Sequence, residues 1–421
     1  MTAIVAVLNK HAVAIAADSA ATISSRNNKK VFNTANKVFT LSKYHPVAVA
    51  IYNNSELVGV PWEIVIKEYR KALGEKSFAT LKEYVGDFFN FIKRKNYFTD
   101  EEGQRKHLKS LMLSFLGEAI SNVRGTNITM VGIPLAAGVT AILDNTIKTA
   151  AGMDVIPAFK DVTKDSFEKY AQVEIDEILN DLSTNLGVVI DRDKMATAMF
   201  YMFTRIRNTP AFSGIVFCGY GEKEVFPSLY SYMLQHVIEG NLSVLTGGDA
   251  QITMGDDVAI MPFAQIDVMQ TLIDGIAPIV KDIYFHGLAD PIKALLLDIS
   301  KQVRPASKKI ADNIDRFVSK GLQKYINDYI DKCDLQRANS YTTPLVNSVS
   351  MLEKEDLADF SESLISITSV KRKMSLNEQN TVGGPIDVLV LSKGDGAIWM
   401  KRKHYFDPDL NPNFFDTYLK H

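Results

Sequence analysis

The residue with the clearest chemical potential in this chain is the second one. The sequence starts Met1-Thr2, and an apolar run over residues 3–8 follows directly. Methionine aminopeptidases remove an initiator methionine when the next side chain is small, so we expect the mature chain to begin with Thr2. A threonine with a free α-amine combines a hydroxyl nucleophile with a base whose pKa is about 7.7–8.0. This pair is an activated nucleophile, and it predicts attack on an amide carbonyl.

A second candidate follows from the pattern of the first twenty residues. Residues 3–8 and 12–17 are two apolar runs joined by a short polar stretch, which predicts a β-hairpin with both faces largely buried. The second run ends at Asp18-Ser19, and antiparallel pairing brings this end beside the start of the first run. Asp18 is therefore expected near Thr2, although an aspartate in this place can also simply cap a turn.

A lysine held by Asp18 would stay cationic and lower the pKa of the Thr2 hydroxyl. The lysines available after Asp18 are Lys29, Lys30 and Lys37. Farther on, a predicted strand at 46–51 leads into a helical segment at 56–73, with Asn54 or Ser55 as a plausible N-cap. Backbone N–H groups at such a strand-to-helix turn are natural oxyanion donors.

These segments together resemble the N-terminal quarter of proteasome β subunits and of the bacterial HslV peptidase, both N-terminal nucleophile (Ntn) hydrolases. The matching runs are Thr2-Ala-Ile-Val-Ala-Val, Val-Ala-Ile-Ala-Ala-Asp18-Ser19, Asn36-Lys37-Val38 and Val-Ala-Ile-Tyr-Asn-Asn-Ser55. The resemblance implies that Thr2 is the nucleophile and general base, with Asp18 and Lys37 as the tuning charge pair. It also implies that the N–H of Asn53 is the oxyanion donor, where the family has a glycine.

Departures from the family pattern leave alternatives open. The step from Asp18 to Lys37 is longer than the family's usual gap, so Lys30 or Lys29 is an alternative functional lysine. In the run Gly219-Tyr220-Gly221, the tyrosine stands where the family carries a supporting serine. A lone G-x-G without a third glycine is weak evidence for nucleotide binding.

The last third of the chain also resembles the family, with an altered supporting shell. Ser350 and Glu353 form a predicted capping box at the start of a helix, and Gly383-Gly384 introduces a strand at 386–391. The aspartate and serine that the family has before these glycines are replaced by Gln379 and Val382, with Glu378 adjacent. The residues predicted to support the nucleophile are Ser19, Lys30, Tyr220, Glu378 and Gly383.

Periodicity divides the chain into β-rich and helical stretches. A discontinuous core is predicted at 2–75, 211–264 and 346–410, with a helical insertion at 76–210, a second one at 265–345 and a C-terminal tail at 411–421. Together with the resemblance, this order predicts an α+β fold, a four-layer αββα Ntn-hydrolase sandwich with helical insertions.

Composition limits the classes of partner and cofactor. The 421 residues are 46% hydrophobic with a formal net charge of −2, an ordinary globular profile with no electrostatic reason to expect nucleic acid or an anionic membrane. Residues 1–20 lack a signal-peptide pattern, and the apolar stretch at 128–143 is too short to span a membrane. The two cysteines and scattered histidines do not form a zinc motif. We expect a cytoplasmic enzyme without metal or other cofactor.

Two functions remain after these exclusions. The first is a threonine peptidase or amidohydrolase that acts on polypeptides. The resemblance implies a homo-oligomer, since that family forms rings, and the sequence does not show an ATPase partner. The second is a non-catalytic Ntn-fold subunit that acts in assembly or scaffolding. In that case Met1 is retained, the amine is blocked and Thr2 is an ordinary strand residue.

Overall fold

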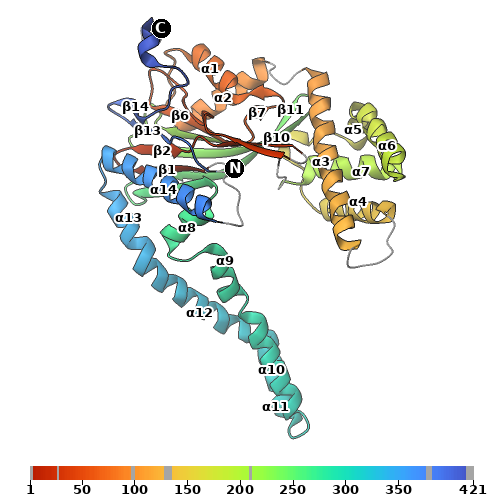
Figure 1. Cartoon of the computed structure of the whole chain (residues 1–421). Coiled ribbons are helices and arrows are strands. Elements are labelled where there is room, and N and C mark those ends of the chain that lie inside the picture. Colours follow the sequence, from red (N-terminus) through yellow and green to blue (C-terminus); the bar gives the residue numbers. More distant parts are fainter. Residues whose placement is uncertain are drawn as a thin grey trace. The chain divides into compact units, whose positions relative to one another are not determined.

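The computed structural model describes residues 3–25, 28–95, 100–127, 135–207, 211–375 and 382–413. This part of the chain is a mixture of α-helices and antiparallel β-sheets (Figure 1). It divides into two compact units. The first comprises Met1–Ala35, Gln251–Ser392 and Ile398–His421, and the second comprises Asn36–Ala250 and Lys393–Ala397.

The first unit is built on a five-stranded sheet in the order β12-β1-β2-β13-β14. Its strands are β1 (Ala3–Asn9), β2 (Val13–Ala17), β12 (Val258–Ala264), β13 (Asp387–Ser392) and β14 (Gly396–Lys401). The central strand pairs bring Ile4 opposite Ala17 and Ala3 opposite Ala264. Every residue of β1 and β2 is buried, so the predicted hairpin of two buried strands is confirmed. A second hairpin, β3 (Ala21–Ser25) and β4 (Asn28–Phe32), was not predicted.

One long helix covers this sheet. Helix α14 (Lys354–Met374) packs on β1, β2 and β13. Because side chains alternate along a strand, Ala3, Val5 and Val7 point to one face, where they join Leu364 in a shared core. The remaining helices of the unit are α8 (Asp267–Asp274), α9 (Pro278–Lys281), α10 (Ala289–Val303), α11 (Lys308–Lys320), α12 (Leu322–Arg337) and α13 (Thr343–Ser350), with the short helical turns η2 (Asp282–His286), η3 (Ala338–Thr342) and η4 (Pro408–Leu410).

The second unit has its own antiparallel five-stranded sheet, in the order β11-β10-β9-β6-β5. Its strands are β5 (Val38–Thr40), β6 (Val47–Asn53), β9 (Ser213–Gly219), β10 (Ser228–Ile238) and β11 (Asn241–Gln251). A small hairpin of β7 (Glu56–Leu57) and β8 (Val60–Pro61) follows β6. Predicted strands at 46–51 and 212–221 therefore correspond to β6 and β9, with ends shifted by one or two residues.

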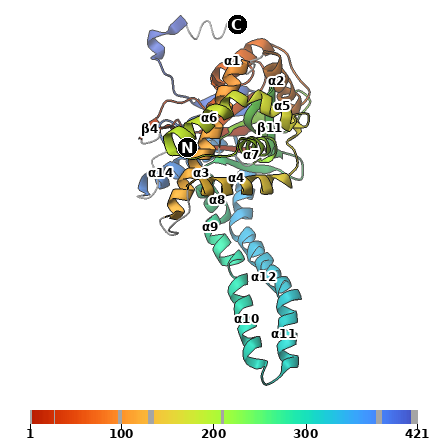
Figure 2. The same ribbon diagram turned by 90° about the vertical axis from the view of Figure 1, so that its right-hand side faces the viewer.

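Helices of the second unit form two cores. Helices α1 (Trp62–Leu73) and α2 (Leu81–Lys95) pack with Phe217 of β9 in the first. The second core is shared by α3 to α7, and Ile238 and Leu245 from β10 and β11 join it (Figure 2). Its elements are α3 (Glu101–Asn127), α4 (Leu135–Ala151), η1 (Pro157–Phe159), α5 (Lys164–Tyr170), α6 (Gln172–Leu186) and α7 (Arg192–Arg205).

Two predicted helix starts are wrong. Helix α1 begins at Trp62 rather than near residue 56, because the β7–β8 hairpin occupies the intervening residues. The capping box at Ser350 does not form. Its hydroxyl donates to the carbonyl of Asn347 at 2.8 Å, and α14 begins at Lys354 after Glu353 without a side-chain cap. Helix α13 runs through Ser350, so this residue is a helix end and not a helix start.

Candidate functional site

The buried carboxylate of Asp18 accepts three backbone hydrogen bonds. One oxygen accepts from the N–H of Ala3 at 2.9 Å, and the other accepts from Gly383 at 3.0 Å and Ala20 at 3.2 Å. The Asp18 N–H in turn donates to the carbonyl of Ala3 at 3.1 Å. The side chain is 1% exposed, and a buried charge is tolerated only where such partners satisfy its oxygens. Asp18 therefore ties the start of β1 to the end of β2.

Ser19, the residue after Asp18, hydrogen-bonds to the loop Gly383-Gly384-Pro385, which we call the glycine loop. Its hydroxyl donates to the carbonyl of Pro385 at 2.5 Å, and its N–H donates to the carbonyl of Gly383 at 3.1 Å. The carbonyl of Ser19 accepts from the N–H of Ala35 at 3.1 Å. The hydroxyl proton is thus committed to a backbone acceptor. These bonds give Ser19 a role in positioning the glycine loop, and its predicted role in supporting the nucleophile stays a prediction.

Two residues close to the start of β1 and to the glycine loop have positive backbone φ angles. Ala264, which pairs with Ala3, has a φ of 68°, and Gly384 has a φ of 76°. A side chain at Gly384 would also clash, because a Cβ there would lie 2.8 Å from the Cβ of Asn33. The next residue after Ala264, Gln265, is 6% exposed. Backbone strain of this kind is typical of functional sites.

Two predicted site residues, Thr2 and Glu378, lie outside the described part of the chain. Thr2 is joined by a peptide bond to Ala3, whose N–H is held by Asp18. Of the alternative lysines, Lys30 is on β4, exposed, with its Nζ 5.0 Å from the ring centroid of Phe32. In the first unit the structure thus brings together Asp18, Ser19 and Gly383.

The other predicted site residues belong to the second unit. Lys37 immediately precedes β5 and is only 5% exposed, and its carbonyl accepts from the N–H of Ile51 at 2.9 Å. Burial of a lysine ammonium group is costly unless the protein supplies partners for it. The assignment of Lys37 as the tuning lysine stays a prediction.

Asn53 ends β6 in a left-handed conformation with a φ of 68°. Its side-chain Nδ2 donates to the carbonyl of Phe212 at 2.8 Å. A non-glycine residue in this region of φ is uncommon and marks a constrained position. The helix N-terminus expected directly after this strand is absent there, because β7 follows β6 and α1 begins only at Trp62. The role of the Asn53 N–H as oxyanion donor stays a prediction.

Tyr220 is a core residue in this structure. It follows β9, is 2% exposed, and its N–H donates to the carbonyl of Pro46 at 3.0 Å. Burial raises the pKa of its hydroxyl well above the ordinary value, so this group stays protonated. Gly219 fixes the turn, because a Cβ at that residue would lie 2.0 Å from the Pro46 carbonyl oxygen.

The residues that the structure describes contain no cluster of three or more His, Cys, Asp or Glu side chains that could hold a metal ion. None of their helices combines the length and the apolar character needed to cross a bilayer.

Two contacts around Asp18 and Ala3 are not predicted by the sequence. The sequence predicts a role for Gly383, but neither its hydrogen bond to Asp18 nor the pairing of Ala264 with Ala3. A signal for the first contact is the run Gly383-Gly384-Pro385, since consecutive glycines mark backbone that approaches other backbone closely.

No protein-family model matches the chain, and no curated protein matches it. One solved structure that does match is a helical assembly of the Anbu complex from Pseudomonas aeruginosa. The alignment covers all of this chain and 96% of the other chain, with 10% sequence identity and a TM-score of 0.26. A TM-score this low does not establish a shared fold.

The family assignment made from the sequence, to proteasome β subunits and HslV, is therefore wrong. It rested on short runs of alanine, valine and isoleucine in β1, β2 and β6. Any strand that is buried on both faces selects such residues, so these runs report burial and hairpin pairing. They do not report membership of a family.

Proposed function

We propose that this chain is an amide hydrolase that uses Thr2 as its nucleophile and the α-amine of Thr2 as its general base, with peptide bonds as substrate. The observation that carries the proposal is the buried carboxylate of Asp18, bonded to the N–H of Ala3. This contact anchors Ala3, the residue next to Thr2, and a nucleophile whose position is restricted in this way would lose less orientational entropy on reaction.

The chemistry needs only Thr2 and water as reacting groups. The Thr2 hydroxyl oxygen attacks the amide carbonyl while the α-amine accepts its proton. Collapse of the tetrahedral intermediate breaks the C–N bond, and the proton passes from the α-amine to the leaving amine. Water then attacks the resulting ester, which regenerates the threonine and releases the acid.

Other predicted roles belong to the same proposal. Lys37 would lower the pKa of the nucleophile, and the Asn53 N–H would bind the oxyanion. Ser19 and Gly383 hold the loop that fixes Asp18. The four-layer αββα arrangement and the cytoplasmic setting expected from the sequence are also parts of this proposal.

The direct test is the intact mass and N-terminal sequence of the purified protein after incubation with an epoxyketone probe. This probe forms its ring only with an N-terminal residue that has both a side-chain hydroxyl and a free α-amine. We expect loss of Met1 and the gain of one probe mass, with both adduct and peptide hydrolysis abolished in Thr2→Ala. The rate should fall by at least about a thousandfold.

Two controls locate the reaction. Thr2→Ser keeps the hydroxyl and the amine and should retain the adduct, and Thr197→Ala changes a threonine of α7 and should react like the wild type. A chain that has lost Met1 but forms no adduct, or an adduct that survives in Thr2→Ala, would refute the proposal.

A second candidate function is a non-catalytic subunit that acts in assembly of a homo-oligomer. The observation that favours it is the apolar surface on the helices between α8 and α13. Leu295 of α10 is 61% exposed and Tyr325 of α12 is 65% exposed. Large apolar side chains exposed on neighbouring helices are often found at interaction surfaces. In this case Met1 is retained and the probe does not react.

A further inference from the structure

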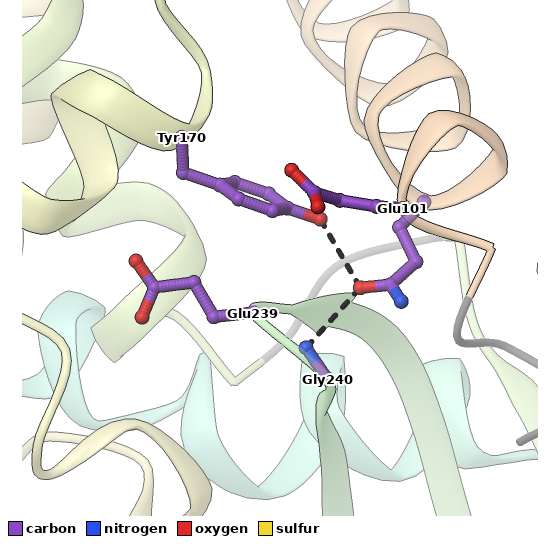
Figure 3. A pocket seen from close by; sticks show the side chains of 5 residues that line it. Glu101, Tyr170, Glu239 and Gly240 are labelled. Carbon is purple, nitrogen blue, oxygen red and sulfur yellow. Dashed lines mark hydrogen bonds between the residues drawn. The ribbon is translucent and has the colours of Figure 1, made fainter.

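A cavity of about 360 Å³ lies in the second unit, whereas Asp18 belongs to the first. It is lined by Glu101 at the start of α3, Gln104 one turn later, Tyr170 at the end of α5, and Glu239 and Gly240 in the turn between β10 and β11 (Figure 3). Its volume is within the range of small-molecule sites. Nothing in the proposed hydrolysis uses it.

The floor of the cavity is organised by the carboxamide of Gln104. This side chain is 3% exposed, and its Oε1 accepts from the N–H of Gly240 at 3.2 Å and from the hydroxyl of Tyr170 at 3.1 Å. A backbone N–H can only donate, so the oxygen of the amide must face Gly240. The NH₂ group then takes the other side, and it makes no hydrogen bond to any residue in the described ranges. The donor hydrogens of this amide are therefore available to an acceptor that enters the cavity.

The turn that carries Glu239 is held rigidly. Both Glu239 and Gly240 have positive φ, 51° and 75°, as expected for a two-residue hairpin turn. The backbone of Glu239 also hydrogen-bonds the Tyr170 hydroxyl, while burial is the main cause that raises the pKa of Tyr170 to about 12. The hydroxyl is therefore protonated at neutral pH and fixed in its donor role toward Gln104.

Charge around the cavity is negative. Glu101 and Glu239 line it, and Glu174 is buried behind Tyr170, while Arg105 is the cation paired with them, 3.2 Å from Glu101 and 3.6 Å from Glu174. Three carboxylates and one guanidinium leave a net charge of −2. Figure 3 places the Glu101 carboxylate beside the Tyr170 hydroxyl and the Glu239 side chain on the other side of the ring. Such a site repels anions and attracts cations.

We infer that this cavity binds the amino end of a peptide, with the ammonium group against Glu101 and the first carbonyl oxygen accepting from the Gln104 amide. An ammonium with a carbonyl two bonds away supplies both things that the cavity lacks, a positive charge and a hydrogen-bond acceptor. A metal ion fits less well, because only two carboxylates line the cavity and no cluster of three or more ligands occurs in the described ranges.

The experiment uses the full chain in a Thr2→Ala background, so that binding is measured without hydrolysis and does not depend on the proposed function. The probe is a tripeptide amide, Ala-Ala-Lys, with a dye on its lysine, followed by fluorescence anisotropy. We expect saturable binding of the free-amine probe and none of its N-acetylated form. Glu101→Gln and Gln104→Leu should each weaken binding by about tenfold or more.

The matched control is Glu102→Gln, which removes a carboxylate from the same turn of α3 that pairs with Lys106 and does not line the cavity. It should bind like the parent. Glu101→Gln alters an exposed side chain and tests the site even if Gln104→Leu unfolds. Equal binding of the acetylated probe, unchanged affinity in Glu101→Gln, or no saturable binding would each overturn the inference.

Discussion

At the scale of single residues, Asp18 is held by N–H groups from three separate parts of the chain, at Ala3, Ala20 and Gly383. Loss of this carboxylate would leave three buried donors without an acceptor, which is among the costliest defects in a protein interior. The same residue therefore serves stability and the proposed chemistry. For this reason the glycine loop that reaches Asp18 is a better place to test the geometry than Asp18 itself.

Gly384→Ala tests that loop. The residue has a φ of 76°, and a Cβ would lie 2.8 Å from the Cβ of Asn33. We expect the free energy of unfolding to fall by about 2–4 kcal/mol, from left-handed strain together with the clash. Urea denaturation measures the change. Gly396→Ala is the matched control, since its φ is 79° with nothing within 4 Å, and it should lose about 1–2 kcal/mol. Equal losses in the two variants would contradict the close approach at Asn33.

At the scale of elements, helix boundaries were decided by neighbours. Thr163 and Ser166 form a full capping box at α5, with backbone-to-side-chain distances of 3.1 and 3.2 Å. The same pattern at Ser350 and Glu353 forms none, because η3 and α13 already carry the chain through Ser350 in helical conformation. A capping pattern predicts a helix start only where the preceding residues are not helical.

The burial of His236 of β10 against α7 predicts that the free energy of unfolding depends on pH. His236 of β10 stacks on Phe159 at 5.2 Å, its Nε2 lies 2.8 Å from the carbonyl oxygen of Phe203, and burial lowers its pKa to about 4. The unfolded chain binds this proton near pH 6.5. Keeping the His236 ring neutral therefore contributes its full share to the free energy of unfolding above pH 6.5. This contribution is lost as the pH falls from 6.5 toward 4, by roughly 3 kcal/mol in all.

Urea midpoints at pH 7, 5.5 and 4.5 measure this loss. His236→Gln stays neutral and should flatten the dependence over that range, although it lowers stability at pH 7 through lost stacking. His45→Gln alters a histidine that bonds to the Glu75 carbonyl and should keep the slope of the wild type. Identical slopes in the wild type and His236→Gln would exclude His236 as the source.

At the scale of the whole molecule, the chain is two units of discontinuous sequence. The first sheet joins β1 and β2 to β12 and β13, which lie more than two hundred residues away along the chain. Its helices from α9 to α12 bury few side chains among those described, namely Ser300, Ala311, Leu322 and Ile326. In Figure 2, α10 lies alongside α11 and α12. So few buried residues give a helical hairpin little stability of its own.

We therefore expect the exposed apolar surface of α9 to α12 to be covered by a second copy of the chain. Sedimentation velocity over a range of concentrations should reveal a concentration-dependent dimer or larger species. Leu295→Glu and Tyr325→Glu each place a charge on an exposed apolar site and should shift the protein toward the monomer. Lys324→Glu, next to Tyr325, changes charge without removing apolar area and should keep the association. A wild type that stays monomeric at every concentration would refute this prediction.

The sequence by itself determined the buried hairpin of β1 and β2, the helical stretches and the placement of Asp18 at the same end as Ala3. These follow from periodicity and from the geometry of an antiparallel pair, which are local. It did not determine the family, since buried strands in unrelated proteins select the same small and branched residues.

Only the tertiary structure decided what surrounds Asp18 and Gln104. The N–H of Gly383, the pairing of Ala264 with Ala3, and the meeting of Gln104 with Gly240 join residues more than a hundred positions apart. Local pattern carries no information on which distant backbone group will fill a buried hydrogen bond, because that choice is made when the layers pack together.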